Sequence, residues 1–177
     1  LQWAPTHDAA PLLYEAFLMQ NGQTPYKDFF DFQMPGSYIA YYLLGISSNF
    51  GPVRLRIIDL AILAGILTIT SFAMRRFGRA AAFAAPILFG LKYLQGGPSL
   101  ALQREYLILP FIALSIWIGV TDSLTFRKRL ILGFLYGLAA TLKPHAAFGL
   151  VPFLLFDMAD LRERRELTLS TLAKQII

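Results

Sequence analysis

Residues 57–74 read IIDLAILAGILTITSFAM, and Arg75, Arg76 and Arg79 follow directly. An apolar run of this length is close to the ~20 residues that a helix needs to cross the hydrocarbon core of a bilayer. Basic residues immediately after such a run are typical of the cytoplasmic end of a span. The stretch therefore predicts a membrane-spanning helix that enters from the outside and ends at the cytoplasmic face.

Three further apolar regions follow, at 80–95, 105–121 and 130–156. Ten of the 16 Lys and Arg residues form three clusters, and they lie at 75–79, 127–129 and 162–174. The positive-inside rule places all three clusters on one side of the membrane, which requires 130–156 to cross twice. We therefore interpret 130–156 as a hairpin with its tip at Lys143–His145, and a single tilted helix is the alternative. Arms of ~13 residues reach only ~20 Å, so we expect the tip inside a cavity.

The predicted fold class is an all-α integral membrane protein, a polytopic helical bundle with amphipathic juxtamembrane helices in its first outer loop. Apolar residues make up 56% of the 177 residues and charged residues 15%, which excludes disorder, and the absence of cysteine excludes a disulfide scaffold. We expect an outer (periplasmic) loop at 1–56, five spans within 57–158, and a cytoplasmic polar segment at 159–177. The chain begins without Met and stops in a polar helix-like run, so we expect the N-terminal part of a longer protein.

The outer segment predicts two short helices that lie on the membrane surface. In the first, residues 8–21, Asp8 stands at the N-cap position and the apolar face is formed by Leu12, Leu13, Ala16 and Phe17. Residues 24–36 are loop-like, with two prolines and two aspartates among aromatics. Residues 37–50 are apolar but short, so we interpret them as an interfacial helix and not as a span. Its aromatic anchors in the headgroup region would be Tyr38, Tyr41 and Tyr42.

The run PYKDFFDFQMPG at 25–36, together with its spacing back to Asp8, resembles the first outer loop of the polytopic GT-C fold glycosyltransferases. The similar branch contains the protein mannosyltransferases and the lipid A aminoarabinose transferases. The resemblance extends along most of the chain, through Arg54–Ile57, the RRFGR turn at 75–79 and the helix end at Thr141–Lys143. It implies transfer of a sugar from a polyprenyl-phosphate donor to a lipid, glycan or protein acceptor. The reaction would take place at the outer face of the cell inner (plasma) membrane.

The resemblance also implies site residues. Asp8 matches the family's outer-loop acidic residue, the proposed catalytic base, and Glu105 matches the acidic residue at the start of the next span. Lys143 matches a basic residue near the carrier phosphate, and Arg104 offers a second cation of the kind that suits phosphate oxygens. Two further candidates for substrate binding lie in the same outer loop, and they are Asp28 and Asp31.

Each of these residues has a simpler interpretation. Asp8 fits an N-cap, and the two loop aspartates fit turn residues. Glu105 at a helix start and Lys143 at a helix end are favoured by the helix dipole alone. We interpret His7 and His145 as bystanders. No cofactor is certain, because no cluster has metal-ligand spacing, and the sequence contains no nucleic-acid motif.

Two other classes of function stay open. A transporter or channel subunit would carry charged residues within its spans and repeated, broken helices. The predicted spans contain only Asp59 and Lys92, and the sequence shows no repeat. A non-catalytic membrane scaffold is excluded by no feature of the chain.

Overall fold

The computed structural model describes residues 9–121 and 124–163, and this part of the chain is helical with no β-strand. The prediction of an all-α protein is confirmed for it. The longer helices are α1 (Ala9–Gln20), α2 (Pro35–Ser48), α3 (Pro52–Met74), α4 (Arg79–Gly96), α5 (Arg104–Thr121), α6 (Phe126–Leu142) and α7 (Leu150–Glu163). Three short 3₁₀ turns connect them, and these are η1 (Arg75–Phe77), η2 (Gly97–Ser99) and η3 (Pro144–Gly149).

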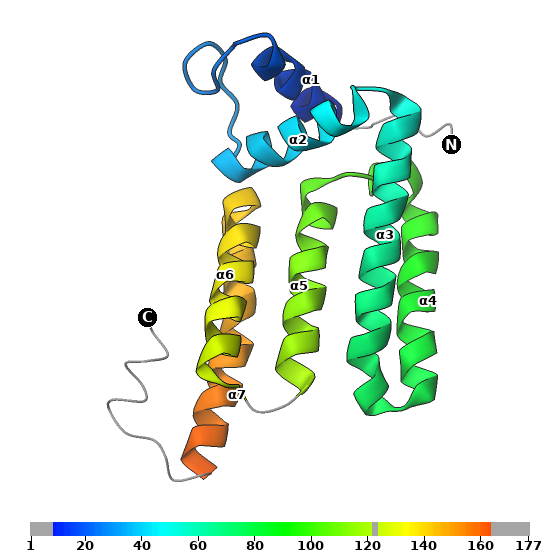
Figure 1. Ribbon diagram of the computed structural model, residues 1–177, viewed down its shortest axis with the longest axis vertical. Coiled ribbons are helices and arrows are strands. Elements are labelled where there is room, and N and C mark those ends of the chain that lie inside the picture. The colour runs from blue at the N-terminus through cyan, green and yellow to red at the C-terminus, as the bar shows by residue number, and fades with distance from the viewer. Residues whose placement is uncertain (1–8, 122–123, 164–177) are drawn as a thin grey trace.

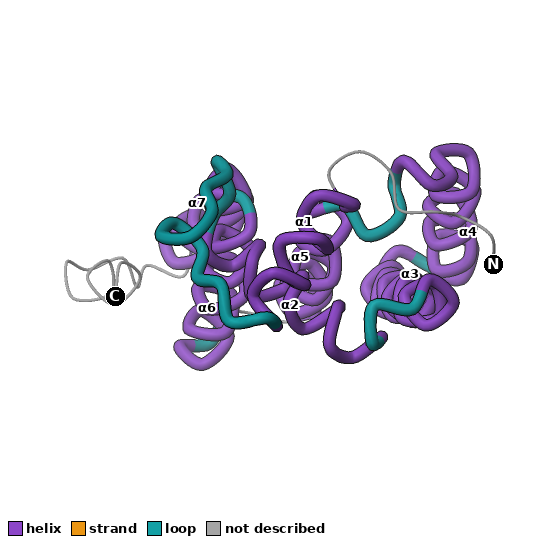
Figure 2. The backbone as a smooth tube through the Cα atoms, turned by 90° about the horizontal axis from the view of Figure 1, so that it is seen from above, coloured by secondary structure: helices purple, strands orange, loops and turns teal. Residues whose placement is uncertain are grey.

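The helices form an upright row with two helices lying across one end. Figure 1 shows α3 to α7 running up and down side by side, while α1 and α2 lie across the top. Seen from above in Figure 2, α1 and α2 cover α5 and reach toward α6. We call the end with α1, α2, η2 and η3 the capped end. The opposite end, with η1, the start of α6 and the end of α7, is the basic end.

α1 confirms the predicted amphipathic helix of the outer segment. Leu12, Leu13 and Ala16 are buried against the rest of the capped end, as their helical spacing predicts. Phe17 differs from the prediction because its side chain is 46% exposed, and it packs edge-on against the ring of Phe50 at 5.6 Å. The buried face therefore includes Ala9 in place of Phe17.

α2 also forms, but it begins at Pro35, where a proline is tolerated in the first helical turn. The prediction that Tyr38 and Tyr41 anchor in lipid headgroups is wrong. Tyr41 is 0% exposed and Tyr38 is 3% exposed, so the remaining protein covers both rings. Tyrosine has an apolar ring and a polar hydroxyl. It therefore fits a buried site where a carbonyl accepts the hydroxyl hydrogen bond as well as it fits the lipid headgroup region.

α3 continues through η1 as the helix Pro52–Phe77, which has 26 residues. It is the one helix in the described part of the chain that is long and apolar enough to cross a membrane by itself. At 1.5 Å per residue it is ~39 Å long, more than the ~30 Å hydrocarbon core. The structure thus shows the helical bundle, and the crossing of a membrane by α3 or by any other helix stays a prediction.

The chain reverses direction between α6 and α7, at the residues where the sequence predicts a hairpin tip. Lys143 is extended (φ −142°, ψ 116°), as expected for a residue before proline, and this ends α6. Pro144 starts η3, after which α7 returns beside α6 (Figure 1). The membrane crossing of the two arms is not tested by this geometry.

α2 is fixed to the ends of two upright helices. The Ser37 hydroxyl donates to the carbonyl of Leu142 at 3.0 Å, and both residues are buried. The Tyr41 hydroxyl donates to the carbonyl of Leu102, just before α5. Gly36 permits this approach, because a Cβ there would lie 2.6 Å from the Thr141 carbonyl oxygen.

Candidate functional site

Most of the predicted site residues lie at the capped end. Arg104 and Glu105 open α5, and Lys143 follows the last residue of α6. Asp28 and Asp31 lie in the loop between α1 and α2. Asp8, the proposed base, lies outside the described residues.

Glu105 and Lys143 form an ion pair that joins the start of α5 to the end of α6. The Lys143 Nζ donates to Glu105 Oε1. The side chain of Lys143 is 18% exposed and that of Glu105 is 51% exposed. A pair this open to water contributes little to folding, roughly 0–1 kcal/mol. Its effect is to hold an ammonium group at a fixed place on the capped end.

Arg104 is bonded to the aspartate loop through a glutamine that the sequence did not single out. Its guanidinium donates to the side-chain oxygen of Gln33. The Gln33 amide nitrogen donates in turn to Asp31 Oδ2 at 2.8 Å. The loop is further held by Tyr38, whose hydroxyl donates to the Asp31 carbonyl at 3.2 Å. Arg104, Gln33 and Asp31 therefore form a continuous chain between α5 and the loop.

Asp28 does not join this chain. Its carboxylate accepts the backbone N–H of Thr24 at 2.7 Å, in an exposed turn. This is the turn-stabilising contact that aspartate commonly makes. His145 is exposed in η3.

Glu15 on α1 is a site residue that sequence reasoning missed. Its Oε2 atom is buried and has no hydrogen-bond partner. The pKa of Glu15 is raised to about 7, mainly by burial and also by the negative charge of Asp31, while the positive charge of Arg104 opposes the shift. The available signal was its position three residues after Leu12 and next to Ala16, at the edge of the buried face of α1. A carboxyl group that titrates near neutral pH is suited to proton transfer.

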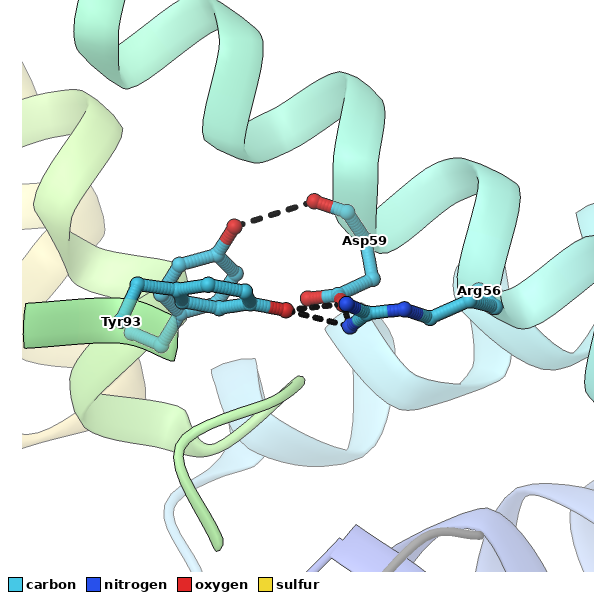
Figure 3. A network of polar contacts seen from close by, with 4 residues as sticks. Arg56, Asp59 and Tyr93 are labelled. Atoms are coloured by element: carbon cyan, nitrogen blue, oxygen red, sulfur yellow. Dashed lines mark hydrogen bonds and ion pairs between the residues drawn. The ribbon is translucent and has the colours of Figure 1, made fainter. Parts of the chain in front are cut away.

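A second polar cluster fastens the upright helices to one another below the site (Figure 3). Asp59 on α3 is 0% exposed and accepts hydrogen bonds from Arg56 and from the hydroxyl of Tyr93 on α4. The hydroxyl of Tyr106 on α5 donates to the Asp59 carbonyl oxygen at 3.0 Å. Burial of a carboxylate is tolerated only with such partners. Because all these contacts lie within the bundle, Asp59 connects α3 to α4 and α5 through hydrogen bonds.

An apolar cavity of about 440 Å³ lies beneath α2. Its walls come from the inner face of α2 and from α3, α5 and α6. Leu142 lines it next to Lys143 in the chain, and Leu107 lines it two residues after Glu105. These two are the lining residues nearest in sequence to the ion pair. The remaining lining residues are Ala40, Leu43, Leu44, Ser47, Ile58, Ile62, Pro110 and Phe111.

Within residues 9–121 and 124–163, no group of three or more acidic or histidine side chains is arranged to hold a metal ion. The chain matches no family model, no curated protein and no solved structure in the comparisons with known proteins. The resemblance to GT-C glycosyltransferases therefore stays an expectation from the sequence motifs.

Proposed function

We propose that this protein is a membrane glycosyltransferase that moves a sugar from a polyprenyl-phosphate donor to a lipid, glycan or protein acceptor. The observation that carries the proposal is the meeting of Arg104, Glu105 and Lys143 with the aspartate loop at one end of the bundle. These groups come from three segments far apart in the chain. Leu142, the residue before Lys143, lines the apolar cavity beneath α2.

We propose further that the bundle is polytopic and lies in the cell inner membrane, with the capped end facing the periplasm. Large apolar side chains face outward along the upright helices, which is unusual for a protein surface in water. Within the described residues, the predicted cytoplasmic cations at 75–79, 127–129 and Arg162 lie toward the opposite end, in agreement with the positive-inside rule. The exposed apolar side chains include Phe83, Ile87, Leu88, Leu91 and Leu94 on α4, Leu130, Ile131 and Phe134 on α6, and Val151, Leu155 and Phe156 on α7.

The proposed chemistry is one displacement at the anomeric carbon of the sugar. The acceptor hydroxyl gives its proton to a carboxylate, for which the family resemblance offers Asp8. As the acceptor oxygen bonds to the anomeric carbon, the bond to the carrier phosphate breaks and its electron pair leaves with the phosphate. Lys143 and Arg104 stabilise the charge that develops on the leaving phosphate.

The ion pair with Glu105 suits this role of Lys143. A lysine ammonium has three N–H donors, so it can hold the carboxylate and a phosphate oxygen together. The apolar cavity beneath α2 offers the first prenyl units of the carrier a path from the bilayer to the phosphate position. No divalent metal enters this scheme, and the partners are the bilayer, the donor and the acceptor.

The test is transfer of a radiolabelled sugar from its polyprenyl phosphate by the full protein in membranes. Asp8→Asn should abolish transfer while the protein still inserts and accumulates normally. Asp28→Asn is the matched control, because Asp28 holds a turn and an asparagine oxygen can accept the same N–H. Undiminished activity of Asp8→Asn would remove Asp8 from the mechanism, and absence of any transfer by the wild type with all polyprenyl donors would refute the proposed function.

A further inference from the structure

A separate pocket lies at the basic end, between the last turn of α3 and the first turns of α4. It encloses about 450 Å³ and is lined by Ser71, Arg75, Arg79, Ala82 and Phe83. We call it the arginine pocket. The turn between α3 and α4 is at the opposite end of these helices from the proposed transfer site (Figure 1). The pocket is therefore not part of that site.

The two walls of the pocket follow from helix geometry. Ser71 and Arg75 are four residues apart, so their side chains project from the same face of the α3–η1 helix. Arg79 and Phe83 have the same spacing on α4. Gly78 turns the chain between them with φ +103°, a conformation that favours glycine. The turn thereby brings two guanidinium groups to a shared hollow.

Arg75 of the pocket differs from its basic neighbours in what it contacts. Arg76 donates to the Val120 carbonyl, and Arg129 is paired with Asp157 at 2.8 Å. The guanidinium carbon of Arg75 lies over the ring of Phe72, 4.3 Å from the ring centroid. Stacking on a ring occupies the face of a guanidinium and leaves its N–H edge available to an anion. No carboxylate is among the described residues that line the pocket.

The lining also contains an apolar wall beside the charges. Phe83 is 68% exposed, and the outward face of α4 continues from it with Ile87 and Leu91. A ligand with an anionic head and an apolar tail would place its head between the arginines and its tail along this face. Phosphate and carboxylate are both anions whose geometry matches guanidinium groups, and phosphate is the one that membrane phospholipids carry.

We propose that the arginine pocket binds the phosphate of an anionic phospholipid in the cytoplasmic leaflet. The site anchors the α3–α4 turn to the lipid surface at a fixed depth. It goes beyond the proposed sugar transfer, because its residues take no part in that chemistry, and it rests on the proposed placement of the bundle in the membrane.

The test is native mass spectrometry of the full protein in detergent, titrated with phosphatidylglycerol or with phosphatidylcholine. The wild type should retain one phosphatidylglycerol in preference to phosphatidylcholine. The double variant Arg75→Gln/Arg79→Gln should bind it about 30-fold more weakly, since a basic residue near a lipid surface contributes about fivefold. Ser71→Leu should weaken binding without a change of charge, because it fills the pocket.

The control is Arg127→Gln/Lys128→Gln, which removes the same charge from the same end but does not line the pocket. It should retain phosphatidylglycerol as the wild type does. Equal loss in both double variants would overturn the proposal in favour of diffuse electrostatic attraction. Displacement of the lipid by millimolar inorganic phosphate would overturn it in favour of a soluble anion, and a wild type without lipid preference would refute it outright.

Discussion

Glu15 makes the stability of the capped end depend on pH. Its pKa rises from 4.5 to about 7 because burial and the charge of Asp31 outweigh the attraction of Arg104. A carboxyl group with a raised pKa in the folded state binds its proton more tightly there than in the unfolded chain. The contribution of Glu15 to stability is therefore fully present below pH 4.5 and is lost as pH rises from 4.5 toward 7 and above.

The magnitude follows from the size of the shift. A shift from 4.5 to about 7 would correspond to roughly 3 kcal/mol for a fully buried group. The Glu15 side chain is only partly buried, and solvent screening reduces this to about 1–2 kcal/mol. Glu15→Gln keeps the shape and removes the ionisation. It should stabilise the protein by this amount at pH 8 and by much less at pH 5.

The measurement is the free energy of unfolding in detergent, followed by circular dichroism at the two pH values. Asp28→Asn is the control, because it also converts a carboxylate of the outer segment to an amide, but in an exposed turn. Its effect should be nearly the same at both pH values. If Glu15→Gln stabilised the protein equally at pH 5 and pH 8, or not at all, the ionised carboxylate would not be the cause and the reasoning would fail.

Three further substitutions test the contacts around the site. Gly36→Ala should destabilise the protein by about 1–3 kcal/mol in unfolding experiments, because the new methyl group meets the Thr141 backbone. Tyr93→Phe should cost about 1–3 kcal/mol, because it removes a hydrogen bond from the buried Asp59 carboxylate. Lys143→Ala should lower sugar transfer by about 100-fold with little change in stability, since a cation at a developing charge is worth far more in the transition state than an open ion pair is in folding.

Each of these substitutions has a matched control. Gly137→Ala on α6 should be neutral or slightly stabilising, because no atom lies within 4 Å of the new methyl group. Tyr14→Phe should be neutral, since Tyr14 is 63% exposed. Lys143→Arg should keep a substantial part of the transfer activity. Destabilisation by Gly137→Ala as large as that by Gly36→Ala, or transfer by Lys143→Ala at the wild-type rate, would contradict the corresponding argument.

Local patterns in the sequence predicted the helices well. The spacing of Leu12, Leu13 and Ala16 predicted α1, and Pro144 marked the end of α6. These features depend on residues within a turn or two of one another, where hydrophobic periodicity and backbone restrictions act directly.

Contacts between distant segments were not predictable in the same way. Nothing near Tyr41 indicates that its partner is the Leu102 carbonyl, and the same amphipathic ring would suit a headgroup. Gln33 became important only because α5 brings Arg104 to it. Asp59 was visible as a charge within an apolar run, but its partner Tyr93 lies on the next helix.

The fastening of α2 has a geometric consequence for the two charged helix ends. Ser37 and Tyr41 are four residues apart, or ~6 Å along the helix axis. One holds the last carbonyl of α6, and the other holds the segment before α5. α2 thus fixes the distance between the end of α6, next to Lys143, and the start of α5, which carries Glu105. Those helices cannot move apart at this end unless a buried hydrogen bond breaks or a turn of α2 unwinds.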